Sequence, residues 1–243
     1  MEQLPFTELL NRILGGPVSA LLLALGIHPD NPRAPINNAT AMEILVVLLL
    51  IGFFLMVRAR LSVEKPGALQ HVVEGFHGFI QRQSDEIIGH HSESFTPFLV
   101  AVGLFILTCN LIGLIPGFES PTAVAFVPLG CAITAFGYYN WQGIRKQGVL
   151  GYAKHFAGPL PILAPLMIPI EIISHLARVL SLTIRLFANM FAGDMVTLVF
   201  FSLIPIGIPV IFLGLHIAVS FLQAYIFVLL TTVYLAGAVA EEH

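Results

Sequence analysis

The sequence predicts an all-α integral membrane protein, and its composition is the first observation that does so. Of the 243 residues, 57% are hydrophobic and only 10% are charged, and the mean hydropathy is +0.89. A soluble domain carries about 25% charged residues, so this chain has too few charges to cover a soluble globule. The second observation is a series of long stretches without Asp, Glu, Lys or Arg, of the order needed to cross a bilayer.

The charge balance and the motif content exclude two functional classes. The net charge is −3 and the sequence has no basic stripe, so it does not predict a nucleic-acid partner. The sequence also lacks a G-x-x-x-x-G-K-[ST] loop, and the chain by itself therefore does not hold a nucleotide through a P-loop.

Residues 1–40 are mixed in character and rich in proline, with an apolar patch at Val18–Ile27. The patch has the length of a signal-peptide core, but Glu2 and Glu8 beside Arg12 make a poor basic leader. We therefore expect an uncleaved segment lying at the outer surface of the membrane, with a cleaved signal peptide as the alternative.

The first predicted transmembrane helix contains the uncharged run Ile44–Val57, which is followed at once by Arg58 and Arg60. At about 1.5 Å per residue, this run is short for a hydrocarbon core of about 30 Å. Either the helix begins earlier, near Ala39, or the two arginine side chains extend to the interface.

Residues 62–91 are expected to form an amphipathic helix along a membrane face. Apolar residues recur there at spacings of three and four, among charged residues and histidines. The apolar positions are Leu69, Val72, Val73, Phe76, Phe79, Ile80, Ile87 and Ile88.

The next two uncharged stretches, Phe95–Phe118 and Ser120–Ile144, predict a transmembrane hairpin with its turn at residues 116–121. Lysines and arginines follow the first and third spans and are missing from that turn, namely Arg58, Arg60, Lys65 and Arg82, and then Arg145, Lys146 and Lys154. The positive-inside rule therefore places the connections 58–94 and 145–158 in the cytoplasm and the N-terminus outside.

Two long apolar stretches, Pro159–Pro205 and Gly207–Ala240, make up the last third of the chain. As one helix, the first would be roughly 60 to 70 Å long, about twice a perpendicular span. It either crosses the membrane twice or lies steeply tilted, and hydropathy does not decide between the two. The first half contains no inverted pair of such segments, which counts against a transporter built from repeats.

Polar residues are threaded through both stretches. At about 100° per residue, one helical stripe of the first stretch gathers Glu171, Ser174, His175, Arg178, Ser181, Arg185 and Asn189. The second stretch contributes His216, Ser220 and Gln223.

Arg185 is the most informative of these residues, because a charge in hydrocarbon costs about 3 kcal/mol or more. Glu171 lies fourteen residues before it, roughly 20 Å along a helix. Asp194 lies nine residues after it, on the opposite helical face. Neither spacing makes a local ion pair, so we expect another chain to supply the carboxylate that faces Arg185.

Arginine keeps its charge without carrying protons, so Arg185 opposite a moving carboxylate would act as an electrostatic gate. Glu171, Asp194 and His216 can titrate, and Ser, Asn and Gln side chains can order water between them. The out-of-phase position of Asp194 indicates two aqueous pathways, one on each side of Arg185.

Structural roles are the alternatives for several of these residues. Arg178 could mark a helix end at the cytoplasmic interface, and Asp194 after Gly193 could cap a helix break. His175 could be a packing residue or a member of a proton relay.

We expect no metal and no cofactor. A metal site of Glu171, Asp194 and His216 would need the fold to bring the three together. The histidines of the amphipathic segment, His71, His77, His90 and His91, have no cysteine nearby, and His71 and His77 lack ligand spacing.

Three motifs resemble subunit a of the F-type ATP synthase. The first is Arg185–Asp194, R-L-F-A-N-M-F-A-G-D, and the second is Gln223–Phe227, Q-A-Y-I-F, continuing through L-L-T-T-V-Y-L at 229–235 to E-E-H at 241–243. The third and weaker one is Asn110–Gly117, N-L-I-G-L-I-P-G. The resemblance covers about residues 40–243. Position 194 is Asp where the family often has Glu, and Ala188 replaces a frequent glycine.

The resemblance implies a stator subunit that lies beside a ring of c subunits, with peripheral-stalk b subunits as further partners. Its last two helices would lie steeply inclined against the ring, and Arg185 would be the gate facing each ring carboxylate. Asn189, Asp194, His216 and Gln223 would line the half-channel open to the outer side. Glu171 and Ser174 would line the half-channel open to the cytoplasm. The chain would not be an enzyme by itself, since ATP chemistry belongs to other subunits.

These expectations divide the chain into an outer-side segment (1–40), peripheral transmembrane helices with the amphipathic helix (41–158), and a ring-facing tilted hairpin with the half-channels (159–243). The expected location is a bacterial inner membrane, with the C-terminus in the cytoplasm. The alternative functions are a self-contained proton-coupled transporter or channel, and a membrane scaffold.

Overall fold

The computed structural model of the chain describes residues 3–28, 31–32, 34–62, 66–89, 92–115, 117–157, 164–203 and 208–240. Every regular element in these ranges is helical. The α-helices are α1 Pro5–Ala24, α2 Asn38–Ala59, α3 Ala68–Ile88, α4 Thr96–Ile112, α5 Phe126–Ala157, α6 Ala164–Leu203 and α7 Ile208–Val239. Two short 3₁₀ turns, η1 Ser92–Ser94 and η2 Pro121–Ala123, flank α4.

Three of the described helices are long and apolar enough to cross a membrane: α2 over its whole length, α6 from Pro165 to Leu203, and α7 from Val210 to Val239. Helix α4 is apolar but has only 17 residues. The prediction of an all-α integral membrane protein is confirmed. Helix α5, which contains most of the predicted span Ser120–Ile144, is not among the three.

Helix α2 begins where a long enough span requires it. The side chain of Asn37 caps its first turn, because Oδ1 accepts a hydrogen bond from the Thr40 amide at 2.7 Å. The 22 residues to Ala59 extend about 33 Å. The start predicted near Ala39 is therefore right, and Arg58 falls in the last turn, where the helix dipole favours a cation.

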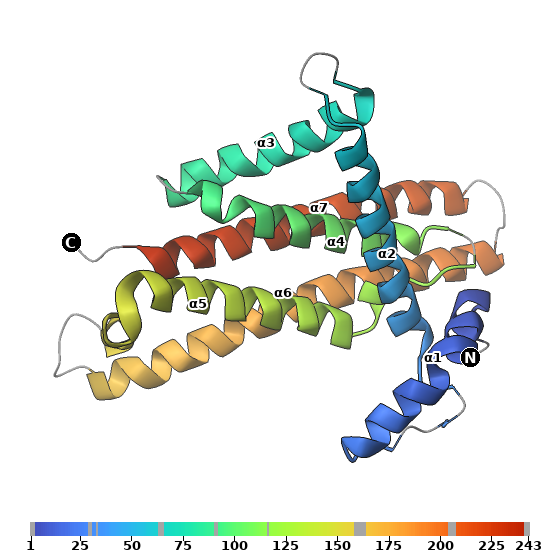
Figure 1. Ribbon diagram of the computed structural model, residues 1–243, viewed down its shortest axis with the longest axis horizontal. Coiled ribbons are helices and arrows are strands. Elements are labelled where there is room, and N and C mark those ends of the chain that lie inside the picture. The colour runs from blue at the N-terminus through green and yellow to red at the C-terminus, as the bar shows by residue number, and fades with distance from the viewer. Residues whose placement is uncertain are drawn as a thin grey trace.

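Helix α3 forms inside the predicted amphipathic segment and packs through its apolar side. Ile80 is buried in a cluster with Leu99 and Val100 of α4 and Val228 of α7. Figure 1 shows α3 running alongside α4, at the end of α2. Of the four histidines considered as a metal site, His90 and His91 lie outside the described residues.

The segments predicted as a hairpin, α4 and α5, do run in opposite directions, joined through η2 (Figure 1). They pack mainly on other helices, α4 on α7 and α5 on α6 and α7. Helix α5 begins at Phe126 rather than Ser120, because residues 121–123 form the 3₁₀ turn.

Helix α5 also continues past its predicted end, so the expected connection 145–158 is helical up to residue 157. The helical dihedral angles break at Gly148, where φ is 75°. The residues of α5 beyond this break fold back against the part before it. The Tyr152 hydroxyl donates a hydrogen bond to Asn140 Oδ1 at 2.7 Å.

Helix α6 is one unbroken helix of 40 residues, about 60 Å long. Of the two alternatives, crossing twice is therefore wrong. Arg178 and Asp194 both lie inside this helix, so neither the helix-end role nor the helix-break cap holds. Figure 1 shows α6 and α7 side by side along their lengths, with α2 crossing their direction.

The main core lies where α6 and α7 meet α4 and α5. Leu182, Leu186 and Met190 follow one another at four-residue spacing and are all buried there. This stripe determines which face of α6 points inward, and it leaves Arg185 at the edge of the buried surface.

Candidate functional site

Arg185 lies in the middle of α6 and is half-buried. Its Nη2 donates a hydrogen bond to Ser181 Oγ, one turn earlier, at 3.2 Å. Among the described residues, no carboxylate forms an ion pair with Arg185. This agrees with the helical spacing of Glu171 and Asp194, which excludes a local pair.

The face of α6 around Arg185 is formed by small exposed residues. Ser181, Ala188 and Ala192 lie within about 60° of Arg185 around the helix, and all three are exposed. Bulkier apolar side chains, Ile184 and Phe191, are exposed beside them. Small residues at a helix surface let a second helix approach closely.

Gln223 of α7 is buried and lies close to Arg185. The two side chains line one small pocket together with Leu182, Leu186, Ile226 and Phe227. The structure thus brings together two of the predicted site residues, one from each long helix.

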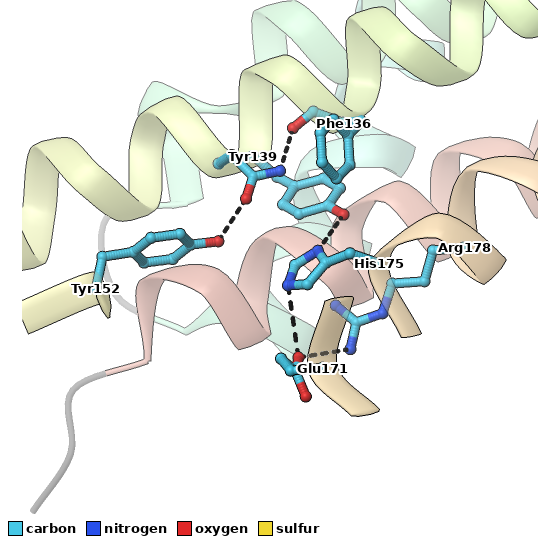
Figure 2. A network of polar contacts seen from close by, with 7 residues as sticks. Phe136, Tyr139, Tyr152, Glu171, His175 and Arg178 are labelled. Atoms are coloured by element: carbon cyan, nitrogen blue, oxygen red, sulfur yellow. Dashed lines mark hydrogen bonds and ion pairs between the residues drawn. The ribbon is translucent and has the colours of Figure 1, made fainter. Parts of the chain in front are cut away.

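A second polar group surrounds Glu171 near the start of α6 (Figure 2). Glu171 Oε1 lies 3.5 Å from His175 Nε2 and 3.9 Å from Arg178 Nη2. The guanidinium of Arg178 also lies over the ring of Tyr234 of α7, 5.0 Å from its centroid. Glu171 is therefore held between two basic side chains of its own helix.

Helix α5 extends this group. Tyr139 Oη lies 3.0 Å from His175 Nδ1, and both residues are buried. The amide of Asn140 donates to the carbonyl of Phe136 at 2.7 Å and accepts from the hydroxyl of Tyr152. Sequence reasoning missed these tyrosines, although a Tyr-Tyr-Asn run within an apolar stretch was the available signal.

A third polar group joins α6 to α7 on the other side of Arg185. His216 Nδ1 lies 3.7 Å from Asp194 Oδ1. The imidazole of His216 is 4% exposed, and its Nε2 has no hydrogen-bond partner among the described residues. It packs against Gly193, where a Cβ would lie 3.0 Å from His216 Nδ1.

Buried polar residues continue from α7 toward the turn between α4 and α5. The Asn110 amide donates to the carbonyl of Ser220 at 3.4 Å, and Asn110 Oδ1 accepts from Thr122 Oγ1 at 2.6 Å. Thr122 in turn shares a hydrogen bond with Ser120 at 2.9 Å. Sequence reasoning did not assign these residues to a pathway, though Asn110 is the one strongly polar side chain within its span.

The two remaining predicted site residues, Asn189 and Ser174, are not part of these polar groups. Asn189 is exposed and Ser174 is half-buried, and no hydrogen bond of either side chain to a described residue is found. Glu171 and Asp194 are 23 residues apart on one helix, about 35 Å. A metal site of Glu171, Asp194 and His216 is therefore ruled out, and the described residues contain no other group of three metal ligands.

Comparison with known proteins identifies a family. The family described as ATP synthase A chain matches residues 40–236. ATP synthase subunit a of Koribacter versatilis (strain Ellin345) is 57% identical over 242 residues, covering 100% of this chain and 99% of its own length. Subunit a of Solibacter usitatus (strain Ellin6076) is 52% identical, covering 96% and 99%. That of Sulfurihydrogenibium sp. (strain YO3AOP1) is 40% identical, covering 82% and 96%.

Proposed function

Because the chain belongs to the ATP synthase A chain family, we propose that α6 and α7 carry protons between the two membrane surfaces and a ring of c subunits, with Arg185 as the gate. The chain is a proton-translocating membrane subunit of an F-type ATP synthase. It is not the catalytic subunit, and ATP chemistry belongs to other chains of the complex.

One observation carries this proposal. Arg185 lies on α6 between the polar group around Glu171 and the polar group of Asp194 and His216, and it has no acidic partner among the described residues. A permanent charge at this depth needs a counter-charge. The small exposed residues around it, Ser181, Ala188 and Ala192, leave room for a helix that brings one. A carboxylate on each c subunit fits this requirement, because it can be neutral in lipid and ionised opposite Arg185.

The two polar groups are proposed to be the two half-channels. Asp194 and His216, with Asn189 and Gln223, would connect the ring carboxylate to the outer side. Glu171 and Ser174 would connect it to the cytoplasm. Their separation along α6 supports this assignment, since a proton can pass from one group to the other only by travelling with the ring.

The gate follows from simple electrostatics. A guanidinium keeps its positive charge at any physiological pH, so a ring carboxylate that approaches Arg185 must release its proton to be stabilised there. A free proton moving between the half-channels would meet the same positive charge in a region of low dielectric constant. Rotation of the ring is therefore coupled to proton transfer, and direct leak is suppressed.

The topology proposed for this role keeps the three parts of the chain described above. Residues 1–40 would lie at the outer surface, 41–158 would form the peripheral helices, and 159–243 would form the ring-facing hairpin. The C-terminus would lie in the cytoplasm of a bacterial cell. The b subunits of the stalk are proposed as partners on the side away from the ring.

The test is Arg185→Ala in the whole complex, reconstituted in vesicles, with ATP-driven acidification and passive proton leak measured separately. We expect pumping to be lost while the complex stays assembled, and leak to rise. Ile184→Ala is the matched control, because it truncates an exposed neighbour without changing charge. Undiminished pumping by the Arg185→Ala complex would exclude the gate.

A further inference from the structure

The surroundings of His175 give this residue more than a packing role (Figure 2). Each ring nitrogen lies near a polar group, Nδ1 near Tyr139 Oη at 3.0 Å and Nε2 near Glu171 Oε1 at 3.5 Å. The ring itself stacks on Tyr139 and meets the edge of Phe136, with centroids 5.9 Å apart in both cases. Turning the imidazole would break both polar contacts, so its orientation is well determined.

The hydroxyl of Tyr139 suits either protonation state of His175. A phenol can donate a hydrogen bond to an unprotonated nitrogen or accept one from an N–H. The carboxylate of Glu171 on the other side lies 3.5 Å from Nε2 and can take a proton from it or return one to it. Gain or loss of a proton therefore leaves no ring nitrogen of His175 without a partner.

Among the residues that the structure describes, the charges around His175 come from one helix. Glu171 and Arg178 of α6 are the charged groups, and the other titratable side chains nearby are the phenols of Tyr139 and Tyr152 from α5 and Tyr234 from α7. Arg178 Nη2 lies 3.9 Å from the carboxylate of Glu171, so the two charges oppose one another. In water an imidazole binds a proton at a higher pH than a carboxylate does, so the imidazole is the group suited to capture the proton first.

We propose that His175 is a proton-carrying residue of the Glu171 half-channel, and that Tyr139 is the residue that positions it. This inference rests on the proposed function, because it assigns a partner to Glu171 within that pathway. When protons enter from the cytoplasm, a hydronium ion gives its proton to Nδ1 of the imidazole and leaves as water, and the Tyr139 hydroxyl then accepts a hydrogen bond from Nδ1–H. The Nε2–H bond then breaks, an O–H bond forms on Glu171, and the electron pair stays on the nitrogen.

As a consequence, the half-channel would take up protons at a higher cytoplasmic pH than it would with a carboxylate alone. An imidazole in water binds a proton near neutral pH, about two pH units above a carboxylate. Removal of the imidazole would leave Glu171 to capture protons alone, and proton capture would then fail at a lower cytoplasmic pH.

The test uses inverted membrane vesicles that contain the whole ATP synthase, so that the cytoplasmic face is outside and its pH can be set. ATP-driven acidification of the lumen is measured from pH 6 to 9 and normalised to assembled complex. For His175→Gln, which keeps a hydrogen-bonding side chain but cannot titrate, we expect the alkaline fall in pumping to move about one pH unit lower. If pumping by His175→Gln falls at the same alkaline pH as pumping by the wild type, the proposal is overturned, whatever the pumping rate.

Two further variants separate proton carrying from packing. Tyr139→Phe keeps the stacked ring and removes only the hydroxyl, so we expect a smaller shift in the same direction. Phe136→Leu changes the packing of the imidazole without touching its polar contacts, and its alkaline limb is expected to match that of the wild type. If His175→Gln does not assemble, Tyr139→Phe decides, and an unshifted profile then overturns the proposal.

Glu171→Gln distinguishes failure of this inference from failure of the proposed function. Loss of pumping by Glu171→Gln with an unshifted His175→Gln profile would refute only the role of His175. Wild-type pumping by Glu171→Gln would refute the assignment of the half-channel itself.

Discussion

Gly193 is the residue at which side-chain size matters most for the proposed outer pathway. Gly193 has no Cβ, which lets the ring of His216 approach the backbone of α6 closely. Asp194 follows directly and lies 3.7 Å from the same ring. The close approach and the polar contact therefore depend on one another.

We expect Gly193→Ala to lower ATP-driven pumping by about tenfold, less than the roughly 10²–10⁴-fold that a positioned proton-transfer group contributes, because the ring is displaced and not removed. The added Cβ would lie 3.0 Å from His216 Nδ1, and the ring would have to move away from Asp194. Alanine is the better helix former, so the amount of assembled complex should not fall.

Gly214→Ala in α7 is the control, because a Cβ there meets nothing within 4 Å. Pumping and assembly are measured side by side in vesicles for both variants. Equal pumping by the two would mean that the close approach of His216 to Gly193 has no part in transport.

At the scale of the elements, α5 and α7 pack closely at the C-terminal part of α5. A Cβ at Gly143 would lie 2.6 Å from the Tyr152 ring and 2.9 Å from the carbonyl oxygen of Ala238 in α7. The missing Cβ of Gly143 thus lets the residues after Gly148 fold back against the first part of α5, and it lets α7 pack beside α5. The same return brings the Tyr152 hydroxyl to Asn140, beside the residues that contact His175.

Gly143→Ala is predicted to destabilise this contact by about 1–3 kcal/mol, the usual cost of overpacking. We expect less of the chain in the membrane and a lower Tm of the detergent-solubilised complex. Gly137→Ala, on the same helix but with open space at its Cβ, should leave both unchanged. A wild-type Tm for Gly143→Ala would show that α5 and α7 are not in close contact at this point.

The molecule as a whole separates its polar groups along two long helices. Glu171 and Asp194 are about 35 Å apart on α6 with Arg185 between them. No contact between described residues connects the two groups across Arg185, so the two proposed half-channels would need a further component to join them. A rotating partner with its own carboxylates would supply that component.

The purified chain alone, in liposomes with an imposed pH difference, is therefore expected to conduct protons no faster than protein-free liposomes. Conduction should appear only when the ring is reconstituted with it. Brisk conduction by the chain alone would favour the alternative of a self-contained channel. The control is a preparation of the ring without this chain.

The class of fold and the lack of a local ion pair at Arg185 could both be predicted from the sequence, because each depends on a local property. Transfer of a residue into hydrocarbon has a free energy that adds up along a helix, so composition and run length reveal a membrane protein. The angle of 100° per residue likewise excludes a local ion pair with Glu171 or Asp194. The motifs at Arg185–Asp194 and Gln223–Phe227 predicted the family independently, and the match to residues 40–236 confirmed that family.

The partners of each polar side chain required the tertiary structure. Hydropathy did not decide whether α6 was one helix, nor did it pair His175 with Tyr139 or Gln223 with Arg185. The physical reason is that lipid tails are as apolar as leucine, so a lipid-facing helix surface and a protein-facing one read alike. Side-chain shape decides which faces of α5, α6 and α7 meet, for example through the absence of a Cβ at Gly143 and Gly193. The hydrophobic periodicity of the sequence does not contain this information.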